Sequence, residues 1–275
     1  MRLIYVLPPV GRNTHESRIS PQEIWLFVFQ PNHFYHMLTN LTFTGADDQV
    51  FVNELAKICK QYPFVELGIL AGNNPPGTQR FPSNDWIDNI ANEWHLPLSL
   101  HLCGDLVDEF LNGSSEIIMK RYPSIQLEHF QRLQINTGGK NRRYEIAFIK
   151  EFLEAEVPDV ELIFQVDGSN LALIDDMSKL ARNGANISFL YDMSKGKGIL
   201  PEKWPDYDPL FHQGYAGGLT PDNLHEQITL IGEKVGDFES WIDIETGVRS
   251  FEKEYFDISK VKTCCEIFKS CHGNF

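Results

Sequence analysis

Eight short apolar segments alternate with helical patterns from residue 38 onward, and this alternation constrains the fold more than any other feature of the chain. Strands that alternate with helices are typical of parallel α/β proteins, in which helices cover both faces of the sheet. The predicted strands are 38–44, 64–70, 98–103, 132–137, 160–166, 187–191, 211–216 and 240–244. The predicted helices are 47–62, 83–94, 144–156, 171–182, 221–235 and 257–269, with helical segments up to residue 122 and a long loop after 187–191.

Two glycine turns near the end of the chain favour a closed barrel over an open sheet. The pair Gly217-Gly218 follows the seventh predicted strand, and Thr246-Gly247 follows the eighth. A doubly wound open sheet would also alternate, but its phosphate loop usually comes early in the chain. Barrels of the (β/α)8 class commonly bind phosphate in the loops after strands seven and eight. We therefore predict a (β/α)8 TIM barrel in which these four residues bind phosphate through exposed backbone N–H groups.

The N-terminal segment does not fit this alternation. A length of 275 residues suits one barrel, since such domains run to about 250 residues. Residues 1–36 combine a Pro-Pro pair, a polar stretch and an aromatic segment, and Met37 directly precedes the first convincing strand. We predict a barrel over residues 37–275 and an N-terminal extension over residues 1–36, which either covers part of the barrel or is upstream sequence outside the domain.

Composition narrows the classes of partner and compartment. The formal net charge is −14, so no broad basic surface is available for nucleic acid. No apolar run approaches the roughly 20 residues that a membrane helix needs. The five cysteines are odd in number and match no zinc-binding spacing, which favours free thiols in a reducing compartment. We expect a cytoplasmic protein that binds neither nucleic acid nor membrane.

Four segments of the chain resemble motifs of the phosphoribosylanthranilate isomerase family. Residues 216–223, Ala-Gly-Gly-Leu-Thr-Pro-Asp-Asn, resemble its seventh-strand motif, and residues 243–248, Asp-Ile-Glu-Thr-Gly-Val, resemble its eighth-strand motif. Residues 189–198 with Trp204 resemble its sixth strand and following loop, and residues 80–83 resemble its arginine motif. The resemblance extends from about residue 38 to the C-terminus and is strongest in the last third. It implies a barrel that catalyses an Amadori-type aldose–ketose rearrangement, as in tryptophan biosynthesis.

The resemblance also implies catalytic positions. Asp192 closes the sixth strand, where the family has its general acid, and the alternative is an aspartate that caps the loop before Ser194. Thr44 ends the first strand, where the family has a cysteine that acts as the base, and a threonine hydroxyl is too weak an acid for that role. Cys103 is a candidate replacement, because a thiol at a strand end beside His101 can be partly ionised. The alternative for Cys103 is a buried thiol that packs as a small hydrophobic side chain.

Further polar residues at strand ends are candidates for substrate binding, because these ends face the active site of a barrel. Arg80 is implied to hold a substrate carboxylate bidentately, and a surface arginine is the alternative. His101, Asn136 and Asp167 are the other candidates for substrate binding, and Glu66, Asp243 and Glu245 are further polar residues expected at strand ends. Glu245 replaces a small hydroxyl residue of the family and would repel phosphate unless it is turned away or protonated.

Two functional hypotheses remain open. The first is an isomerase that acts without a cofactor, as a monomer or homodimer, on a sugar phosphate related to N-(phosphoribosyl)anthranilate. The second is a phosphate-ligand-binding barrel whose chemistry has changed or been lost, such as a hydrolase, a lyase or a binding protein. A metal site has less support, because no compact motif joins its possible ligands, which are Glu66, His101, Asp167, Asp192 and Asp243.

Overall fold

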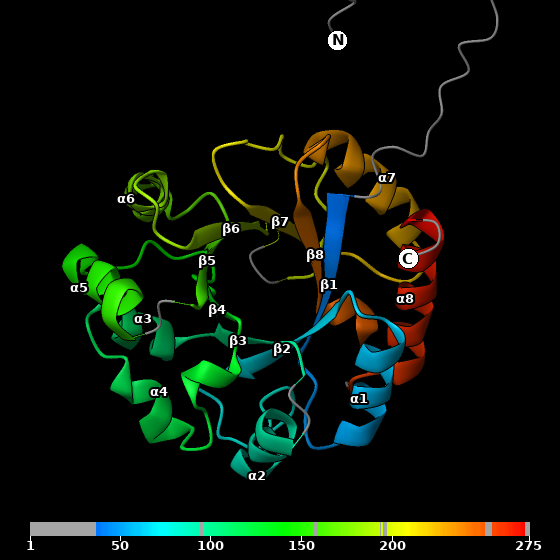
Figure 1. The fold of residues 1–275 in the computed structure, drawn as a ribbon, viewed down its shortest axis with the longest axis horizontal. Helices are drawn as coiled ribbons and strands as arrows, with labels where there is room; N and C mark the ends of the chain where they lie inside the picture. Colours follow the sequence, from blue (N-terminus) through cyan, green and yellow to red (C-terminus); the bar gives the residue numbers. More distant parts are fainter. Residues whose placement is uncertain are drawn as a thin grey trace, which may run out of the picture. The chain divides into compact units, whose positions relative to one another are not determined.

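Eight parallel strands close on themselves in the computed structural model, which describes residues 37–93, 96–156, 159–192, 194, 197–250 and 255–272. Each strand pairs with the next, and the first pairs with the last, so the sheet is a closed barrel surrounded by helices (Figure 1). The predicted (β/α)8 barrel is confirmed, whereas the predicted extension 1–36 lies outside the described residues. The strands are β1 (Leu38–Thr44), β2 (Val65–Ala71), β3 (Leu98–Leu102), β4 (Arg132–Ile135), β5 (Glu161–Val166), β6 (Ile187–Tyr191), β7 (Gln213–Ala216) and β8 (Ser240–Ile244).

The helices follow the predicted positions but differ at several ends. In the described ranges, β6 is followed by a loop up to β7, as the sequence predicts, and no helix is long and apolar enough to cross a membrane. The α-helices are α1 (Val52–Gln61), α2 (Asn84–Asp88), α3 (Asp105–Leu111), α4 (Glu116–Arg121), α5 (Ile146–Glu151), α6 (Leu171–Arg182), α7 (Leu224–Val235) and α8 (Ile258–His272). The shorter helical turns are η2 (Asn89–Glu93), η3 (Leu127–His129), η4 (Phe152–Glu156) and η5 (Thr246–Val248).

Two helices begin later than the sequence predicts, because a polar side chain holds the preceding loop in another conformation. Helix α1 begins at Val52 rather than near Asp47, whose carboxylate instead accepts hydrogen bonds from the backbone of Gln49 and Arg80. Helix α7 begins at Leu224, because the side chain of Asn223 bonds the backbone of both Thr220 and Gly218. Both loops lie at the C-terminal ends of strands, where they contribute to the site.

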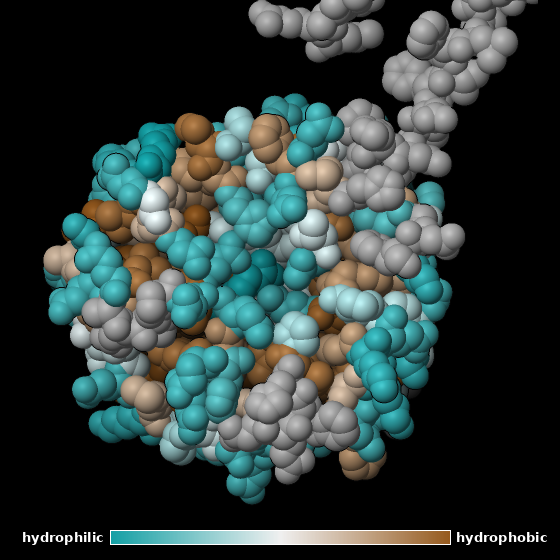
Figure 2. All heavy atoms as spheres, viewed as in Figure 1, coloured by the Kyte–Doolittle hydropathy of each residue, from teal (hydrophilic) through white to brown (hydrophobic). Residues whose placement is uncertain are grey.

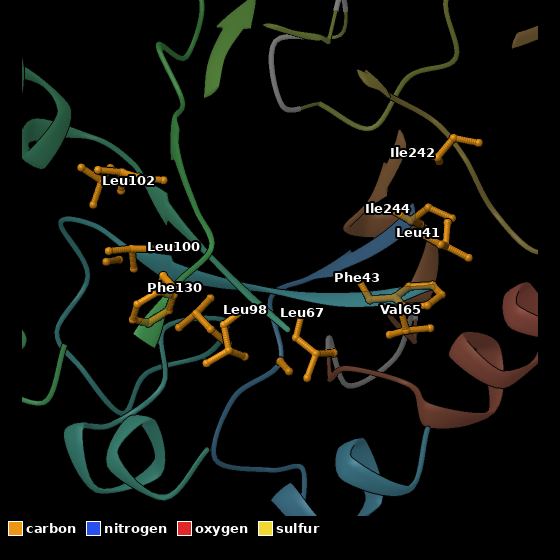
Figure 3. Packing of buried hydrophobic residues seen from close by; sticks show 14 of the residues in the cluster. Leu41, Phe43, Val65, Leu67, Leu98, Leu100, Leu102, Phe130, Ile242 and Ile244 are labelled. Carbon is orange, nitrogen blue, oxygen red and sulfur yellow. The ribbon is translucent and has the colours of Figure 1, made fainter. Parts of the chain in front are cut away.

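The main hydrophobic core lies between the strands and the surrounding helices. Leu41, Phe43 and Val65 lie on the side of their strands that faces α1 and α8 (Figure 3). Alternate residues of the same strands point into the barrel, since successive side chains of a strand face opposite sides. Inside the barrel a second, small apolar cluster contains Ile163, Leu190, Ala216 and Trp241.

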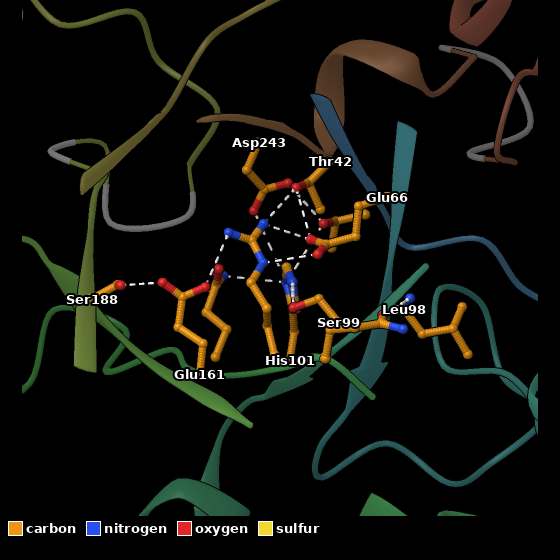
Figure 4. Close-up of polar contacts among 12 residues, drawn as sticks. Thr42, Glu66, Leu98, Ser99, His101, Glu161, Ser188 and Asp243 are labelled. Carbon is orange, nitrogen blue, oxygen red and sulfur yellow. Dashed lines mark hydrogen bonds and ion pairs between the residues drawn. The ribbon is translucent and has the colours of Figure 1, made fainter. Parts of the chain in front are cut away.

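An ion-pair network fills the N-terminal part of the barrel interior. Arg132 donates two hydrogen bonds to the carboxylate of Glu66, at 2.8 and 2.6 Å, and one to Thr42 at 3.0 Å. Its guanidinium lies over the ring of Trp241, 4.5 Å from the centroid, and 3.7 Å from Glu161. Figure 4 shows Thr42, Glu66 and Glu161 converging from three strands. Glu66 was expected at the C-terminal end of its strand, and this prediction is wrong. It is the second residue of β2 and lies toward the N-terminal end of the barrel.

Candidate functional site

A pocket of about 400 Å³ opens at the C-terminal ends of the strands. Polar residues gather over the middle of the barrel on the face seen in Figure 2. Most of the predicted site residues line the pocket. The strand topology brings these residues together from positions far apart in the sequence. These residues are Arg80, His101, Cys103, Asn136, Asp192, Gly217, Gly218, Thr246 and Gly247, and they are joined by Gln134, Gln165, Ser194, Asp243 and Glu245.

Asp192 directly follows β6, and its carboxyl group accepts hydrogen bonds from Gln165 and Ser194. Gln165 Nε2 donates to its Oδ2 at 2.9 Å, while the backbone N–H and hydroxyl of Ser194 donate to its Oδ1 at 3.1 and 2.5 Å. The side chain is buried yet lines the pocket. These contacts fix the carboxyl in one orientation at the edge of the pocket, close to the glycine turn after β7.

The glycine turn after β7 presents the backbone to the pocket. Gly217 and Gly218 have φ angles of +113° and +67°, which favour glycine over residues with a side chain. Among the described residues, the backbone N–H groups of Gly217, Gly218 and Gly247 donate no hydrogen bond. A Cβ atom on Gly217 would lie only 3.2 Å from Asp192 Oδ1, so the turn and the carboxyl adjoin. In the described ranges, the pocket thus places backbone N–H groups that donate no hydrogen bond beside the carboxyl group of Asp192.

Asp243, in β8, lies on the floor of the pocket beside the first strand. Thr44 donates a hydrogen bond of 2.7 Å to Asp243 Oδ1, and His101 Nδ1 lies 4.0 Å from the other carboxyl oxygen. Thr44 is buried and is not among the residues that line the pocket, so its hydroxyl supports Asp243 from below the surface. Burial raises the pKa of Asp243 to about 7, and the nearby Glu245 adds to this, whereas the Thr44 hydrogen bond and Arg132 oppose it.

His101 is a neutral neighbour of Asp243. Gln134 Nε2 lies 3.2 Å from its Nδ1, and Ser99 Oγ lies 3.1 Å from its Nε2. An amide nitrogen can only donate, so Nδ1 is the acceptor and Nε2 carries the proton. Burial, with the charge of Arg132, lowers the pKa of His101 to about 3, so the ring stays uncharged near neutral pH. The imidazole therefore gives Asp243 no cationic partner.

The thiol of Cys103 lines the pocket but is poorly suited to act as a base. Burial raises its pKa to about 12, and the Asn136 amide, whose nitrogen donates to Sγ at 3.3 Å, offsets this only in part. Asn136 also accepts a hydrogen bond of 2.8 Å from Gln134. The thiol consequently remains protonated near neutral pH, and Asn136 lies between it and the strand-four glutamine.

Arg80 and Glu245 form an ion pair at one side of the pocket. The guanidinium donates to the carboxylate at 2.8 Å, and each side chain is 32% exposed. The backbone of Arg80 has a φ of 70°, and its N–H is bonded to Asp47 at 2.7 Å, which holds the residue in this unusual conformation. Burial raises the pKa of Glu245, and Arg80 opposes this shift. The arginine expected to hold a substrate carboxylate is thus already paired with a carboxylate of the protein.

Asp167, like Thr44, is a predicted site residue that the structure places apart from the pocket lining. Its carboxylate accepts hydrogen bonds from the Gly139 backbone at 2.5 Å, from the Ser169 backbone and from the Thr137 hydroxyl. These bonds join the loops after β4 and β5. Asp167 therefore shapes the rim of the barrel in this structure.

Several lining residues were not predicted from the sequence. Gln134 and Gln165 each lie between two apolar residues of a buried strand, and this polar position is a signal that could have identified them. Ser194 follows Asp192 by two residues, a spacing typical of a local side-chain turn. No group of three or more His, Cys, Asp or Glu side chains in the described ranges is arranged to hold a metal ion.

Comparison with known proteins agrees with this architecture. The chain matches no protein-family model and no curated protein sequence. Among solved structures, it is similar to phosphoribosyl anthranilate isomerase from Thermotoga maritima, with a TM-score of 0.51 and 16% identity, over 85% of this chain and 100% of that chain. The chain shares the barrel fold of that isomerase. A phosphoribosyl anthranilate isomerase in complex with reduced 1-(o-carboxyphenylamino)-1-deoxyribulose 5-phosphate is similar to the same extent, with a TM-score of 0.51, 17% identity and the same coverage.

Proposed function

We propose that this protein is an aldose–ketose isomerase that catalyses an Amadori-type rearrangement of an N-substituted ribosylamine phosphate. The observation that carries the proposal is the placement of Asp192 against the glycine turn. Its Oδ1 would lie 3.2 Å from a Cβ atom on Gly217, and both residues line one pocket. A phosphate bound at the turn would bring its sugar beside this carboxyl group.

The pocket has backbone donors for a phosphate group and enough volume for a small sugar phosphate. Within the described part of the chain, the N–H groups of Gly217, Gly218 and Gly247 donate no hydrogen bond, so they are suitable donors to phosphate oxygens. The pocket volume of about 400 Å³ lies within the range of small-molecule sites, roughly 300–1,000 Å³. The similar solved complex holds a deoxyribulose 5-phosphate derivative, a ligand of the same chemical class.

In the proposed reaction, the carboxyl group of Asp192 gives a proton to the ring oxygen of the sugar. The bond between this oxygen and C1 then breaks, and the nitrogen lone pair forms the C1–N double bond of an iminium ion. A base next removes the proton from C2, and the electrons form an enaminol. Return of a proton to C1 and loss of the proton from the C2 hydroxyl give the ketose. General acid–base catalysis of this kind typically contributes about 10²–10⁴-fold to rate.

The Arg80–Glu245 ion pair favours a second candidate, a barrel that binds the sugar phosphate without isomerising the anthranilate compound. A ligand carboxylate must compete with Glu245 for the guanidinium, which lies 2.8 Å from that residue. The two candidates differ in their response to N-(5-phosphoribosyl)anthranilate, since the isomerase converts it and the binding protein does not.

The test is a turnover assay with N-(5-phosphoribosyl)anthranilate, in which the ketose product is separated by chromatography. We expect conversion by the wild-type protein and a loss of about 10²-fold or more in Asp192→Asn, with unchanged thermal unfolding. Asp206→Asn, an exchange at an exposed carboxylate far along the loop, is the matched control and should keep full activity. Absence of wild-type turnover, together with binding of the product analogue, would favour the second candidate.

A further inference from the structure

The structure assigns the role of general base to Asp243, held in place by Thr44, in the isomerisation proposed above. This inference rests on the proposed function and identifies the group that removes the C2 proton. It also explains how the chain functions with threonine at the end of the first strand. The argument depends on strand register, on the local hydrogen bonds and on the surroundings of the carboxyl group.

Strand register places Asp243 at the level of Asp192, two strands away. Tyr191 pairs with Tyr215, so Asp192 is level with Ala216, and Ala216 pairs with Asp243. Adjacent strands are about 4.8 Å apart, which puts the two aspartate backbones roughly 10 Å apart on either side of Ala216. Ala216, which has a small side chain, lines the pocket together with Asp192 and Asp243. In the proposed reaction the sugar lies there, with its ring oxygen toward Asp192 and C2 toward Asp243.

The pairing of β1 with β8, which closes the barrel, brings Thr44 to Asp243. Strands β1 and β8 pair in parallel, with Thr42 beside Asp243 and Phe43 beside Ile244. The Thr44 hydroxyl donates to Oδ1 at 2.7 Å, which leaves the other carboxyl oxygen available to the pocket. Gly68, on β2, provides the room, because a Cβ atom there would lie 2.2 Å from Thr44 Oγ1. Thr44 is therefore a positioning residue.

The surroundings suit a base that works near neutral pH. The titratable and charged groups around Asp243 come from β2, β3, β4 and the loop after β8. The negative charges of Glu66 and Glu245 disfavour the ionised form of Asp243, and the positive charge of Arg132 favours it. His101 is neutral, and the Cys103 thiol is protonated. With the pKa of Asp243 raised to about 7, its carboxylate is a stronger base than an ordinary aspartate and is still substantially ionised near neutral pH.

The proton balance closes with these two side chains. The Asp243 carboxylate takes the proton from C2 of the iminium ion, and the C2–H electrons become the C1–C2 double bond of the enaminol. Protonated Asp243 then returns a proton to C1. The Asp192 carboxylate, which gave its proton to the ring oxygen, accepts the proton from the C2 hydroxyl as the ketone forms. Both residues end in the state in which they began, and no other reactant is consumed.

The first test measures turnover of N-(5-phosphoribosyl)anthranilate by Asp243→Asn, a substitution that keeps the size of the side chain. We expect kcat to fall by about 10²–10⁴-fold, with retained affinity for reduced 1-(o-carboxyphenylamino)-1-deoxyribulose 5-phosphate. Wild-type turnover of substrate deuterated at C2 should be slowed if proton removal limits the rate. A variant that retains wild-type kcat would overturn the inference and leave the proposed function intact, whereas a wild-type protein without turnover would remove both.

The second test uses the pH profile, which a purely structural role would not move. Because a base acts when it is deprotonated, kcat/KM of the wild-type protein should rise with pH through about 7. The Thr44 hydrogen bond lowers the pKa of Asp243, so Thr44→Val should move this rise to higher pH, and Thr44→Ser should restore it. An unmoved profile in Thr44→Val would contradict the assignment even if Asp243→Asn fails to fold.

Discussion

Replacement of Glu245 by serine should increase the affinity of the pocket for a ligand that carries a carboxylate. In the structure Arg80 Nη1 lies 2.8 Å from Glu245 Oε1, so a ligand carboxylate must displace this partner before it can bind the guanidinium. The substitution releases Arg80 and also removes a negative charge from the side of the pocket. Serine is a small hydroxyl residue of the kind that the isomerase family has in the eighth-strand motif that residues 243–248 resemble.

The size of the effect follows from the exposure of the pair. A hydrogen bond to a charged group contributes about 1.5–3 kcal/mol when it is well shielded from water. Both side chains are 32% exposed, and exposed ion pairs contribute about 0–1 kcal/mol. We therefore expect a gain of about 1 kcal/mol, which corresponds to roughly fivefold tighter binding.

The assay is calorimetric titration with reduced 1-(o-carboxyphenylamino)-1-deoxyribulose 5-phosphate, compared with ribose 5-phosphate, which has no carboxylate. Glu245→Ser should bind the first ligand more tightly, and the gain for the second should be smaller. The double variant Glu245→Ser, Arg80→Met should lose the difference between the ligands. An equal gain for both ligands would refute the reasoning, because it would show that only the overall charge of the pocket matters.

Three further predictions concern the barrel interior and the glycine turn. Arg132→Met should lower the free energy of unfolding by about 3–5 kcal/mol in denaturant titrations, because it leaves the buried Glu66 carboxylate unpaired, and the double variant with Glu66→Leu should recover much of the loss. Gly218→Ala should abolish phosphate binding in titrations with inorganic phosphate, because its Cβ atom would lie 2.1 Å from the backbone nitrogen of Leu200 and its φ is +67°. Asp243→Asn should flatten the pH dependence of stability between about pH 4 and 7. The folded wild-type protein holds a proton on Asp243 that the unfolded chain has released in this range, so wild-type stability relative to the variant should fall as pH rises through it.

The order of strands could be predicted from the sequence because each strand leaves a local pattern. Short apolar segments separated by helical periodicity are sufficient to identify a parallel barrel, and the late Gly217-Gly218 turn is sufficient to favour closure over an open sheet. Helix starts were less predictable, since they depend on contacts between loops. The carboxylate of Asp47 bonds the backbone of Arg80, 33 residues away, and nothing near Asp47 in the sequence indicates this.

The polar interior could be predicted only in part. Strand-end position identified Asp192 and Asp243 as pocket candidates, because the ends of barrel strands share one face. The same reasoning misplaced Glu66, which lies near the start of β2 and pairs with Arg132. Glu66 lies near the start of both the predicted strand 64–70 and β2, so its position along the strand should have excluded it from the C-terminal end. The pairing of Arg80 with Glu245 joins residues 165 apart, which depends on the closed topology.

Barrel closure explains why position 44 is best interpreted together with the last strand. Thr44 and Asp243 are 199 residues apart in the sequence. From the sequence alone, a threonine at the end of the first strand indicates that the base of the isomerase family is missing. In the closed barrel β1 and β8 are neighbours, so a side chain that ends β1 contacts the same part of the pocket as one near the end of β8. A hydroxyl at position 44 can then orient a carboxylate that the eighth strand supplies. The proposed base thus depends on the pairing of β1 with β8, and a change on one of these strands can be compensated on the other without moving the carboxyl group of Asp243.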